Sequence, residues 1–198
     1  MHPLLRREIF MKVVYLIGIP GTGKTTIMKE FMKTQCGEWK QDRPIDLLDT
    51  HVNGNVRILG KYEEGETFSG TDRLSMAVAP KAIEWISTQP DELIVGEGDR
   101  LNNAGFFEAC GNNLTIIHLT VSDAERERRY KERGSDQSEK FIQTTRTKCA
   151  NILERFGDQQ TLFGVEKGNV VEFAHENPSD TDKIVAFLNE QTSSSLSP

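Results

Sequence analysis

Residues 18–25, GIPGTGKT, combine glycines, a lysine and a threonine at a spacing that suits phosphate binding. They fit the pattern G-x-x-x-x-G-K-[ST] between an apolar run and a helical pattern. Glycines let backbone N–H groups turn toward phosphates, the lysine reaches the outer phosphates, and the hydroxyl suits Mg²⁺. The residues we expect to bind ATP are Gly18, Gly21, Thr22, Gly23, Lys24, Thr25 and Thr26. Lys24 is also expected to be catalytic, and Thr25 to ligate Mg²⁺.

Two acidic residues directly follow a second apolar run. LIVG leads into Glu97, Gly98, Asp99 and Arg100. Carboxylates at the carboxyl end of a parallel strand face the ligand crevice, where they can orient Mg²⁺ or accept a proton from a hydroxyl. We expect Asp99 to be catalytic and a metal ligand, and Glu97 and Arg100 to contact the substrate. The sequence leaves open which carboxylate serves the metal and which the proton.

The segment GKYEEGETFSGTDRLSM stands where an acceptor would bind. We expect Asp72 to be catalytic, taking a proton or binding a base edge, and Arg73 to hold a phosphate; the alternative for Asp72 is a helix cap. Tyr62 and Phe68 are candidates to stack on a base, while Trp85 fits the core better.

A basic segment follows in an otherwise acidic chain. Residues 126–148 contain eight Lys/Arg and four Asp/Glu, whereas the whole chain has a net charge of -6. Arg126, Arg129 and Arg133 share one helix face. We expect these three to be catalytic, on a lid that closes over the phosphates. The alternative is a solvated helix with Glu–Arg pairs.

The elements that must position these residues alternate along the chain. Apolar runs at 11–17, 91–100, 113–121 and 169–174 predict strands, residues 56–62 a further one, and amphipathic segments between them predict helices. This order predicts an α/β fold with a parallel sheet of about five strands and helices on both faces. With the motif at residues 18–25, the chain resembles the P-loop NTPases, and this resemblance implies their three-layer sandwich. We expect an N-terminal extension at 1–10, one kinase domain at 11–191 with a lid at 122–148, and a disordered tail at 192–198.

Composition restricts the class of protein. The chain has 198 residues, 36% of them hydrophobic, and no apolar run of the roughly 20 residues that a membrane helix needs. The first ten residues do not form a secretory signal, and three scattered cysteines suit a reducing compartment. We therefore expect a cytoplasmic protein that does not bind membranes.

The order of P-loop, strand-end Asp99-Arg100 and arginine-rich helix resembles the nucleoside and nucleotide kinases, thymidylate kinase among them. The segments FSGTDRLSM and GEGDRL resemble phage-encoded P-loop kinases that include the 5-hydroxymethyl-deoxyuridine DNA kinases. This second resemblance covers short motifs over roughly residues 12–150. The acceptor region departs from the nucleotide-kinase pattern, because the usual phosphate-binding arginine and stacking residues are not recognisable there.

These resemblances imply transfer of a phosphoryl group from ATP, with Mg²⁺, to the hydroxymethyl group of 5-hydroxymethyl-deoxyuridine in DNA. In a phage this would be a step in thymidine hypermodification in the host cytoplasm. Two alternatives stay open at this stage. One is a deoxynucleoside monophosphate kinase that acts on free deoxynucleotides, and the other is a nucleotide-binding regulator or ATPase that has no acceptor.

Overall fold

A computed structural model describes residues 11–63, 65–66, 69–89, 93–134, 137–157 and 169–194. The expected extension at 1–10 lies outside these ranges. Among the described residues, no helix has both the length and the apolar composition to cross a membrane.

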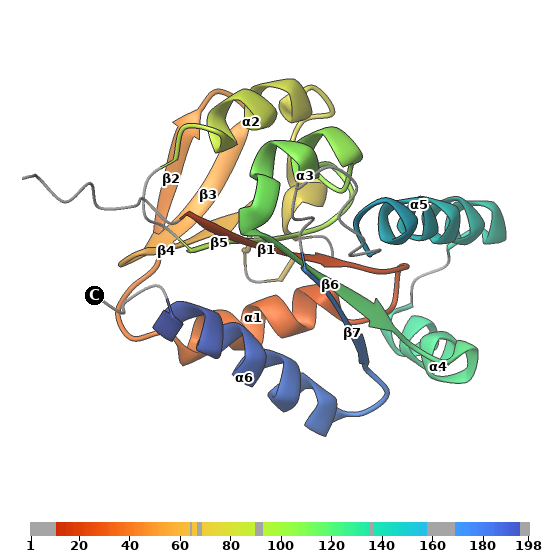
Figure 1. Ribbon diagram of the computed structural model, residues 1–198. Helices are drawn as coiled ribbons and strands as arrows, with labels where there is room; N and C mark the ends of the chain where they lie inside the picture. Colours follow the sequence, from red (N-terminus) through yellow and green to blue (C-terminus); the bar gives the residue numbers. More distant parts are fainter. Residues whose placement is uncertain are drawn as a thin grey trace, which may run out of the picture.

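The centre of the fold is a seven-stranded sheet in the order β2-β3-β4-β5-β1-β6-β7 (Figure 1). The strands are β1 (Lys12–Ile17), β2 (Lys40–Ile45), β3 (Leu48–Asn53), β4 (Val56–Leu59), β5 (Leu93–Glu97), β6 (Leu114–Thr120) and β7 (Asn169–Ala174). The strands β4, β5, β1, β6 and β7 pair in parallel, which confirms the predicted parallel sheet for these five strands.

The predicted count of about five strands omits a hairpin at one edge. Strand β3 pairs antiparallel with β2 and β4, and β2 is the edge strand. The β2 sequence KQDRPI is exposed over its first four residues and contains a proline. Such an edge strand has no apolar alternation from which to predict it.

Helices cover both faces of the sheet (Figure 1). They are α1 (Lys24–Thr34), α2 (Val78–Ile86), α3 (Ala104–Cys110), α4 (Asp123–Arg133), α5 (Glu139–Gly157) and α6 (Pro178–Ser194), with short 3-10 turns η1 (Thr71–Arg73) and η2 (Gly111–Asn113). Helices α1 and α6 pack on one face, and α2, α3 and α5 on the other. Helix α6 ends at Ser194, so the helix includes the first three residues of the expected tail.

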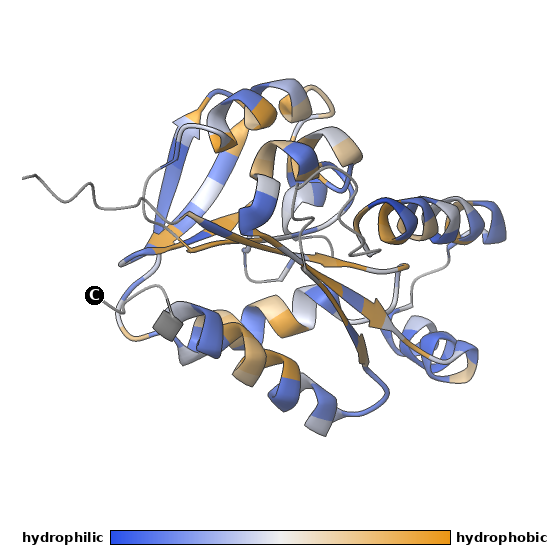
Figure 2. Ribbon diagram, in the orientation of Figure 1, coloured by the Kyte–Doolittle hydropathy of each residue, from blue (hydrophilic) through white to orange (hydrophobic). Residues whose placement is uncertain are grey.

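Successive residues of β1 serve two cores. Val13, Tyr15 and Ile17 pack with α2, α3 and α5, whereas Val14 and Leu16 pack with α1 and α6. All five are essentially inaccessible to solvent. Because both faces of β1 are buried, its sequence is a nearly continuous apolar run, and Figure 2 shows the central strands coloured mostly as hydrophobic.

The register of the sheet brings the predicted functional segments together. Leu16 of β1 pairs with Glu97 of β5, so the loop that follows β1 and the acidic end of β5 lie side by side. Tyr15 ties a third segment to this point, because its hydroxyl donates to the Gly98 carbonyl at 2.9 Å and lies 3.0 Å from Thr71 Oγ1. The ring packs edge-on against Phe106 and Phe107.

We expect Tyr15→Phe to lower the free energy of unfolding by about 1–3 kcal/mol, because the buried Gly98 carbonyl loses its donor while the ring packing stays. Urea unfolding of the ligand-free protein measures this change. A loss below about 0.5 kcal/mol, the usual scatter of surface substitutions, would contradict the role of this hydroxyl.

Candidate active site

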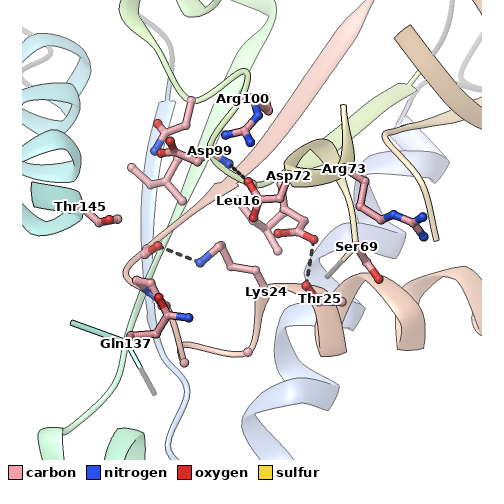
Figure 3. A pocket seen from close by; sticks show the side chains of 18 of the residues that line it. Leu16, Lys24, Thr25, Ser69, Asp72, Arg73, Asp99, Arg100, Gln137 and Thr145 are labelled. Carbon is pink, nitrogen blue, oxygen red and sulfur yellow. Dashed lines mark hydrogen bonds between the residues drawn. The ribbon is translucent and has the colours of Figure 1, made fainter. Parts of the chain in front are cut away.

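A cavity of about 640 Å³ opens at the carboxyl ends of β1 and β5 (Figure 3). Its wall comes from the loop between β1 and α1, the segment around η1, the loop after β5, and the α4–α5 region. The predicted residues that line it are Gly18, Gly21, Gly23, Lys24, Thr25, Asp72, Arg73, Glu97, Asp99, Arg100 and Arg133. The fold therefore gathers the candidate donor and acceptor residues in one cavity.

The loop between β1 and α1 has the backbone that phosphate binding requires. Gly21 and Gly23 have φ of 87° and 89°, in the left-handed region that favours glycine. Lys24 Nζ donates to the Gly18 carbonyl at 2.8 Å and to the Ile19 carbonyl at 3.1 Å. The lysine is thus held against the loop on which phosphates would sit, and needs only to exchange carbonyl oxygens for phosphate oxygens.

Two of the residues assigned to ATP do not line the cavity. Thr22 is buried, and its hydroxyl donates to the Ile19 carbonyl at 2.9 Å, which stabilises the loop itself. Thr26 is exposed on α1 and is not part of the cavity wall.

Glu97 is the carboxylate next to the phosphate-binding loop. Its Oε1 accepts hydrogen bonds from Thr25 Oγ1 at 3.0 Å and from the Tyr62 hydroxyl at 3.3 Å, and only 1% of the residue is exposed. Burial raises the pKa of the Glu97 carboxyl to about 7; the positive charge of Lys24 opposes this rise and the negative charge of Asp72 adds to it. The group is therefore partly protonated at neutral pH.

The expectation that Asp99 shares a metal with Thr25 is not supported by the geometry. Asp99 Oδ1 lies 2.6 Å from Lys148 Nζ of α5, and the oxygen beside Thr25 belongs to Glu97. Gly98, with φ of 106°, turns the chain after β5 and directs Asp99 toward α5. This turn separates two carboxylates that the sequence places only two residues apart.

Asp72 faces the cavity from η1 (Figure 3). Its Oδ1 accepts the backbone N–H of Asp99 at 2.5 Å, and the neighbouring Thr71 hydroxyl donates to the Glu97 carbonyl at 2.8 Å. These two bonds join η1 to the end of β5. The alternative role as a cap of the following helix is wrong, because α2 begins at Val78.

Arg73 and Arg100 were both predicted to lie near the acceptor. Both line the cavity, and each donates to a residue at its rim. Arg73 donates to Glu63 at 2.7 Å and lies 3.8 Å from Glu66. Arg100 Nε donates to the Leu74 carbonyl at 3.3 Å. Arg73 is thus largely compensated by carboxylates, whereas Arg100 has a neutral partner.

The expected lid helix packs against the phosphate-binding loop instead of covering it. Arg129 donates to the Gly21 carbonyl at 3.0 Å and to the His175 carbonyl at 2.7 Å, and the Tyr130 hydroxyl donates to the Pro20 carbonyl at 2.9 Å. Arg126 is buried and pairs with Asp123 at 2.6 Å within α4.

Of the three predicted lid arginines, Arg133 lines the cavity and Arg126 and Arg129 do not. The Glu–Arg pairing that we weighed as an alternative is present, since Arg129 Nε donates to Glu125 at 2.8 Å. The basic helix thus supports the loop from behind, and only its last turn reaches the ligand space.

The sequence did not point to His175, which lies under the phosphate-binding loop. Its Nδ1 is 2.6 Å from the Thr22 carbonyl, so Nδ1 carries the hydrogen, and Nε2 is 2.8 Å from Thr181 Oγ1. A Cβ atom on Gly23 would lie 2.4 Å from the imidazole. Its place directly after the predicted strand at 169–174 was the one available signal.

The candidate stacking residues have different roles. Tyr62 uses its hydroxyl on Glu97 and does not line the cavity, and Trp85 is buried in the core as expected. Phe68 lies outside the described residues.

Thr25 and Glu97 are suitable as the protein ligands of a magnesium ion. A hydroxyl and a carboxylate are hard oxygen ligands, and Mg²⁺ in kinases takes one or two protein ligands plus phosphate oxygens and water. Within the described ranges, no group of three or more His, Cys, Asp or Glu side chains forms a complete metal site. Such a site would need the nucleotide phosphates.

Residues 9–189 match the protein family described as P-loop Nucleotide Kinase3. The chain belongs to this family. Comparison with curated proteins gives no significant match.

Solved structures similar to this kinase include a sugar kinase from Janibacter sp. HTCC2649, unliganded, at 14% identity, with 90% of this chain and 95% of that chain covered and a TM-score of 0.45. A gluconokinase from Sinorhizobium meliloti 1021 is 14% identical, with 93% and 99% coverage and a TM-score of 0.41. The G domain of the T. maritima FeoB iron transporter is 11% identical, with 90% and 99% coverage and a TM-score of 0.30.

The raised pKa of Glu97 predicts how stability depends on pH. Between about pH 4.5 and about 7, Glu97 stays protonated in the folded protein but ionises in the unfolded chain, so the free energy of unfolding falls as pH rises. Glu97→Gln removes this titration and leaves an amide oxygen for Thr25. We expect the ligand-free variant to be more stable than the wild type at pH 8, by up to about 3 kcal/mol, and not at pH 4.

Thermal unfolding of both proteins across pH 4–8 measures this difference. Glu84→Gln, an exposed substitution on α2, is the matched control and should follow the wild type. Parallel stability curves for Glu97→Gln and the wild type would show that the pKa of Glu97 is the same in the folded and the unfolded protein, and would contradict the raised pKa.

Proposed function

We propose that this kinase transfers the γ-phosphoryl group of ATP to a hydroxyl group, namely the hydroxymethyl group of 5-hydroxymethyl-deoxyuridine in DNA. One observation carries the proposal: the carboxylate of Asp72 lies in the same cavity as Lys24 and the Thr25–Glu97 pair. A base for the acceptor and a site for the donor are thus present together. The family supports the kinase activity, and the acceptor is our inference.

On the donor side, the backbone of residues 18–23 and the start of α1 would hold the phosphates of ATP. Lys24 would leave the Gly18 and Ile19 carbonyls and bind the outer phosphates. Thr25 Oγ1 and Glu97 would hold Mg²⁺, which neutralises charge on the β- and γ-phosphates when bound. Glu97 then replaces Asp99 as our metal-side carboxylate, and it must lose its proton to take this role.

On the acceptor side, Asp72 is oriented for proton transfer. Its Oδ1 is held by the Asp99 N–H, which leaves Oδ2 to accept the proton of an incoming hydroxyl. A hydroxyl acceptor gains from such a base, because its oxygen is a weak nucleophile until the proton is removed. The side chain of Asp99 is fixed by Lys148, and the backbone N–H of Asp99 then positions the carboxylate of Asp72.

The charge of the cavity favours a hydroxyl over a phosphate acceptor. A monophosphate brings two negative charges and needs cations that are free to bind it. Arg73, the cation nearest Asp72 in the chain, is engaged by Glu63 and Glu66. Arg100 and Arg133 also line the cavity and could bind the phosphate of a nucleotide. Their position keeps a deoxynucleoside monophosphate kinase as the second candidate function.

The choice of DNA as the carrier rests on the likeness of FSGTDRLSM and GEGDRL to phage DNA kinases. These segments contain Asp72 and Glu97, the two carboxylates to which we assign the acceptor and the metal. The hydroxymethyl group sits on a base, so a base inside a duplex must first leave the stack. Arg100, which lines the cavity and donates to a neutral carbonyl, is available for the DNA backbone.

We expect Lys24→Ala to reduce phosphoryl transfer to an oligonucleotide with 5-hydroxymethyluracil by at least about 100-fold, because a cation that stabilises transition-state charge is lost. Transfer of labelled γ-phosphate from ATP measures this effect. Lys33→Ala is the matched control, since Lys33 is exposed at the far end of α1. Near-normal transfer by Lys24→Ala would overturn the donor site.

Asp72→Asn keeps the bond to the Asp99 N–H but removes the base. We expect kcat for transfer to fall by about 100-fold or more, with ATP affinity changed less than twofold. Nucleotide binding by calorimetry and transfer by label are measured on the same preparation. Unimpaired transfer would reduce Asp72 to a structural role, and a matching loss of ATP binding would move it to the donor site.

A further inference from the structure

An aromatic side chain with no assigned role lies in the wall of the cavity. Phe141, in the first turn of α5, is 44% exposed. Among the described residues, one other large apolar side chain is exposed, Met76 at 78%, and it is not part of the cavity wall. An apolar ring exposed in the wall of a cavity is suited to cover a planar apolar surface.

The backbone holds Phe141 in a defined position. Its N–H donates to the Ser138 carbonyl at 2.9 Å, and its own carbonyl accepts the Thr145 hydroxyl at 3.0 Å. Thr145 also lines the cavity, one helical turn further along α5. The backbone that carries the ring is therefore already ordered, and a ligand that stacks on the ring has only its side-chain torsions to fix, which limits the entropy lost on binding.

Helix α5 connects Phe141 to the segment that we assign to the acceptor. Phe141 and Lys148 are seven residues apart and share a helix face. Lys148 binds both the carboxylate and the carbonyl of Asp99, at 2.6 Å and 3.1 Å. Asp99 in turn holds Asp72, the proposed base, so the helix face that carries Phe141 reaches the acceptor segment two turns further along, at Lys148.

The cavity also contains buried polar atoms that lack partners. Asn102 Oδ1, in the loop after β5, and Ser69 Oγ, before η1, have no hydrogen-bond partner within the described residues. The two residues are 4% and 2% exposed. An unpaired buried polar atom costs stability, and such atoms are found where a ligand completes the site. Asn102 follows Asp99 by three residues in the loop after β5, and both residues line the cavity.

We propose that the ring of Phe141 is the stacking platform for the pyrimidine base that accepts the phosphate, and that the Asn102 amide meets the hydrogen-bonding edge of this base. The inference rests on the proposed function and names the part of the acceptor that the protein recognises. A carboxamide pairs a donor and an acceptor with the adjacent N–H and C=O of a uracil ring. The base is then bound as a single unstacked ring, which an intact duplex cannot offer.

The test is Phe141→Ala, with Phe141→Trp as the conservative variant and Met76→Ala as the exposed control outside the cavity. Initial rates give KM and kcat separately for ATP and for an oligonucleotide with one 5-hydroxymethyluracil. Stacking of one base corresponds to about 5- to 150-fold in affinity. We expect Phe141→Ala to raise the KM of the oligonucleotide within this range, the KM of ATP to change less than twofold, and the Trp variant and control to match the wild type.

Binding without catalysis separates this inference from the proposed function. The 5-hydroxymethyl-deoxyuridine mononucleotide is titrated into Phe141→Trp and into wild type, and we expect tryptophan emission to be quenched in the variant above the wild-type background. Asn102→Ala should weaken this binding at least about fivefold, the loss of one hydrogen bond. Quenching without transfer in the wild type would retain the platform and overturn the proposed reaction.

An unchanged oligonucleotide KM in Phe141→Ala would overturn the platform. A rise in the KM of ATP alone would do the same, because Phe141 would then serve the donor adenine. Circular dichroism of each variant checks folding, and the exposed position of the side chain makes a folded protein the expected result.

Discussion

The contact between Thr25 and Glu97 is the constraint on which the rest of the site depends. It joins the first turn of α1 to the end of β5, and it buries a carboxyl group beside a lysine. Burying a carboxylate without ligands is costly, so the ligand-free site holds it partly as the neutral acid. Binding of a divalent cation would reverse this preference and release a proton. The buried charge of Glu97 is therefore most costly when no cation is bound and the pH is high enough to ionise the carboxyl group.

A second layer of residues keeps the phosphate-binding loop in one shape. His175 supports the loop from beneath, where it donates a hydrogen bond to the Thr22 carbonyl. From α4, Arg129 donates to the Gly21 carbonyl and Tyr130 to the Pro20 carbonyl. These contacts use loop carbonyl oxygens and so leave the loop N–H groups for phosphates. The basic helix that the sequence suggested as a lid thus acts mainly as a support, and transition-state stabilisation falls to Lys24 and Arg133 in our account.

Sequence patterns predicted what depends on local periodicity or on short motifs. The apolar run of β1 and the glycines of the loop follow from backbone geometry that neighbouring residues determine. Roles that depend on tertiary contacts were beyond such patterns. The turn at Gly98 decides that Glu97, not Asp99, reaches Thr25, and nothing in the order of residues encodes its direction.

The same limit applies to the hairpin β2–β3 and to Phe141. The exposed edge strand has a polar sequence without alternation, and the position of Phe141 in the cavity depends on how α5 docks against the loop after β5. Its apolar type alone would place it in the core. Only the packing of α5 against the loop that contains Asp99 exposes this ring in the cavity, where a ligand could stack on it.

The most direct measurement of the central claim is a competition in a single reaction. The wild-type protein, ATP and Mg²⁺ are mixed with an oligonucleotide carrying one 5-hydroxymethyluracil, the matching thymine oligonucleotide and a mixture of deoxynucleoside monophosphates, and mass spectrometry locates the transferred phosphate. We predict phosphate on the hydroxymethyl oxygen and on no other acceptor. Phosphate on a monophosphate, or only inorganic phosphate from ATP, would contradict a hydroxyl acceptor served by Asp72.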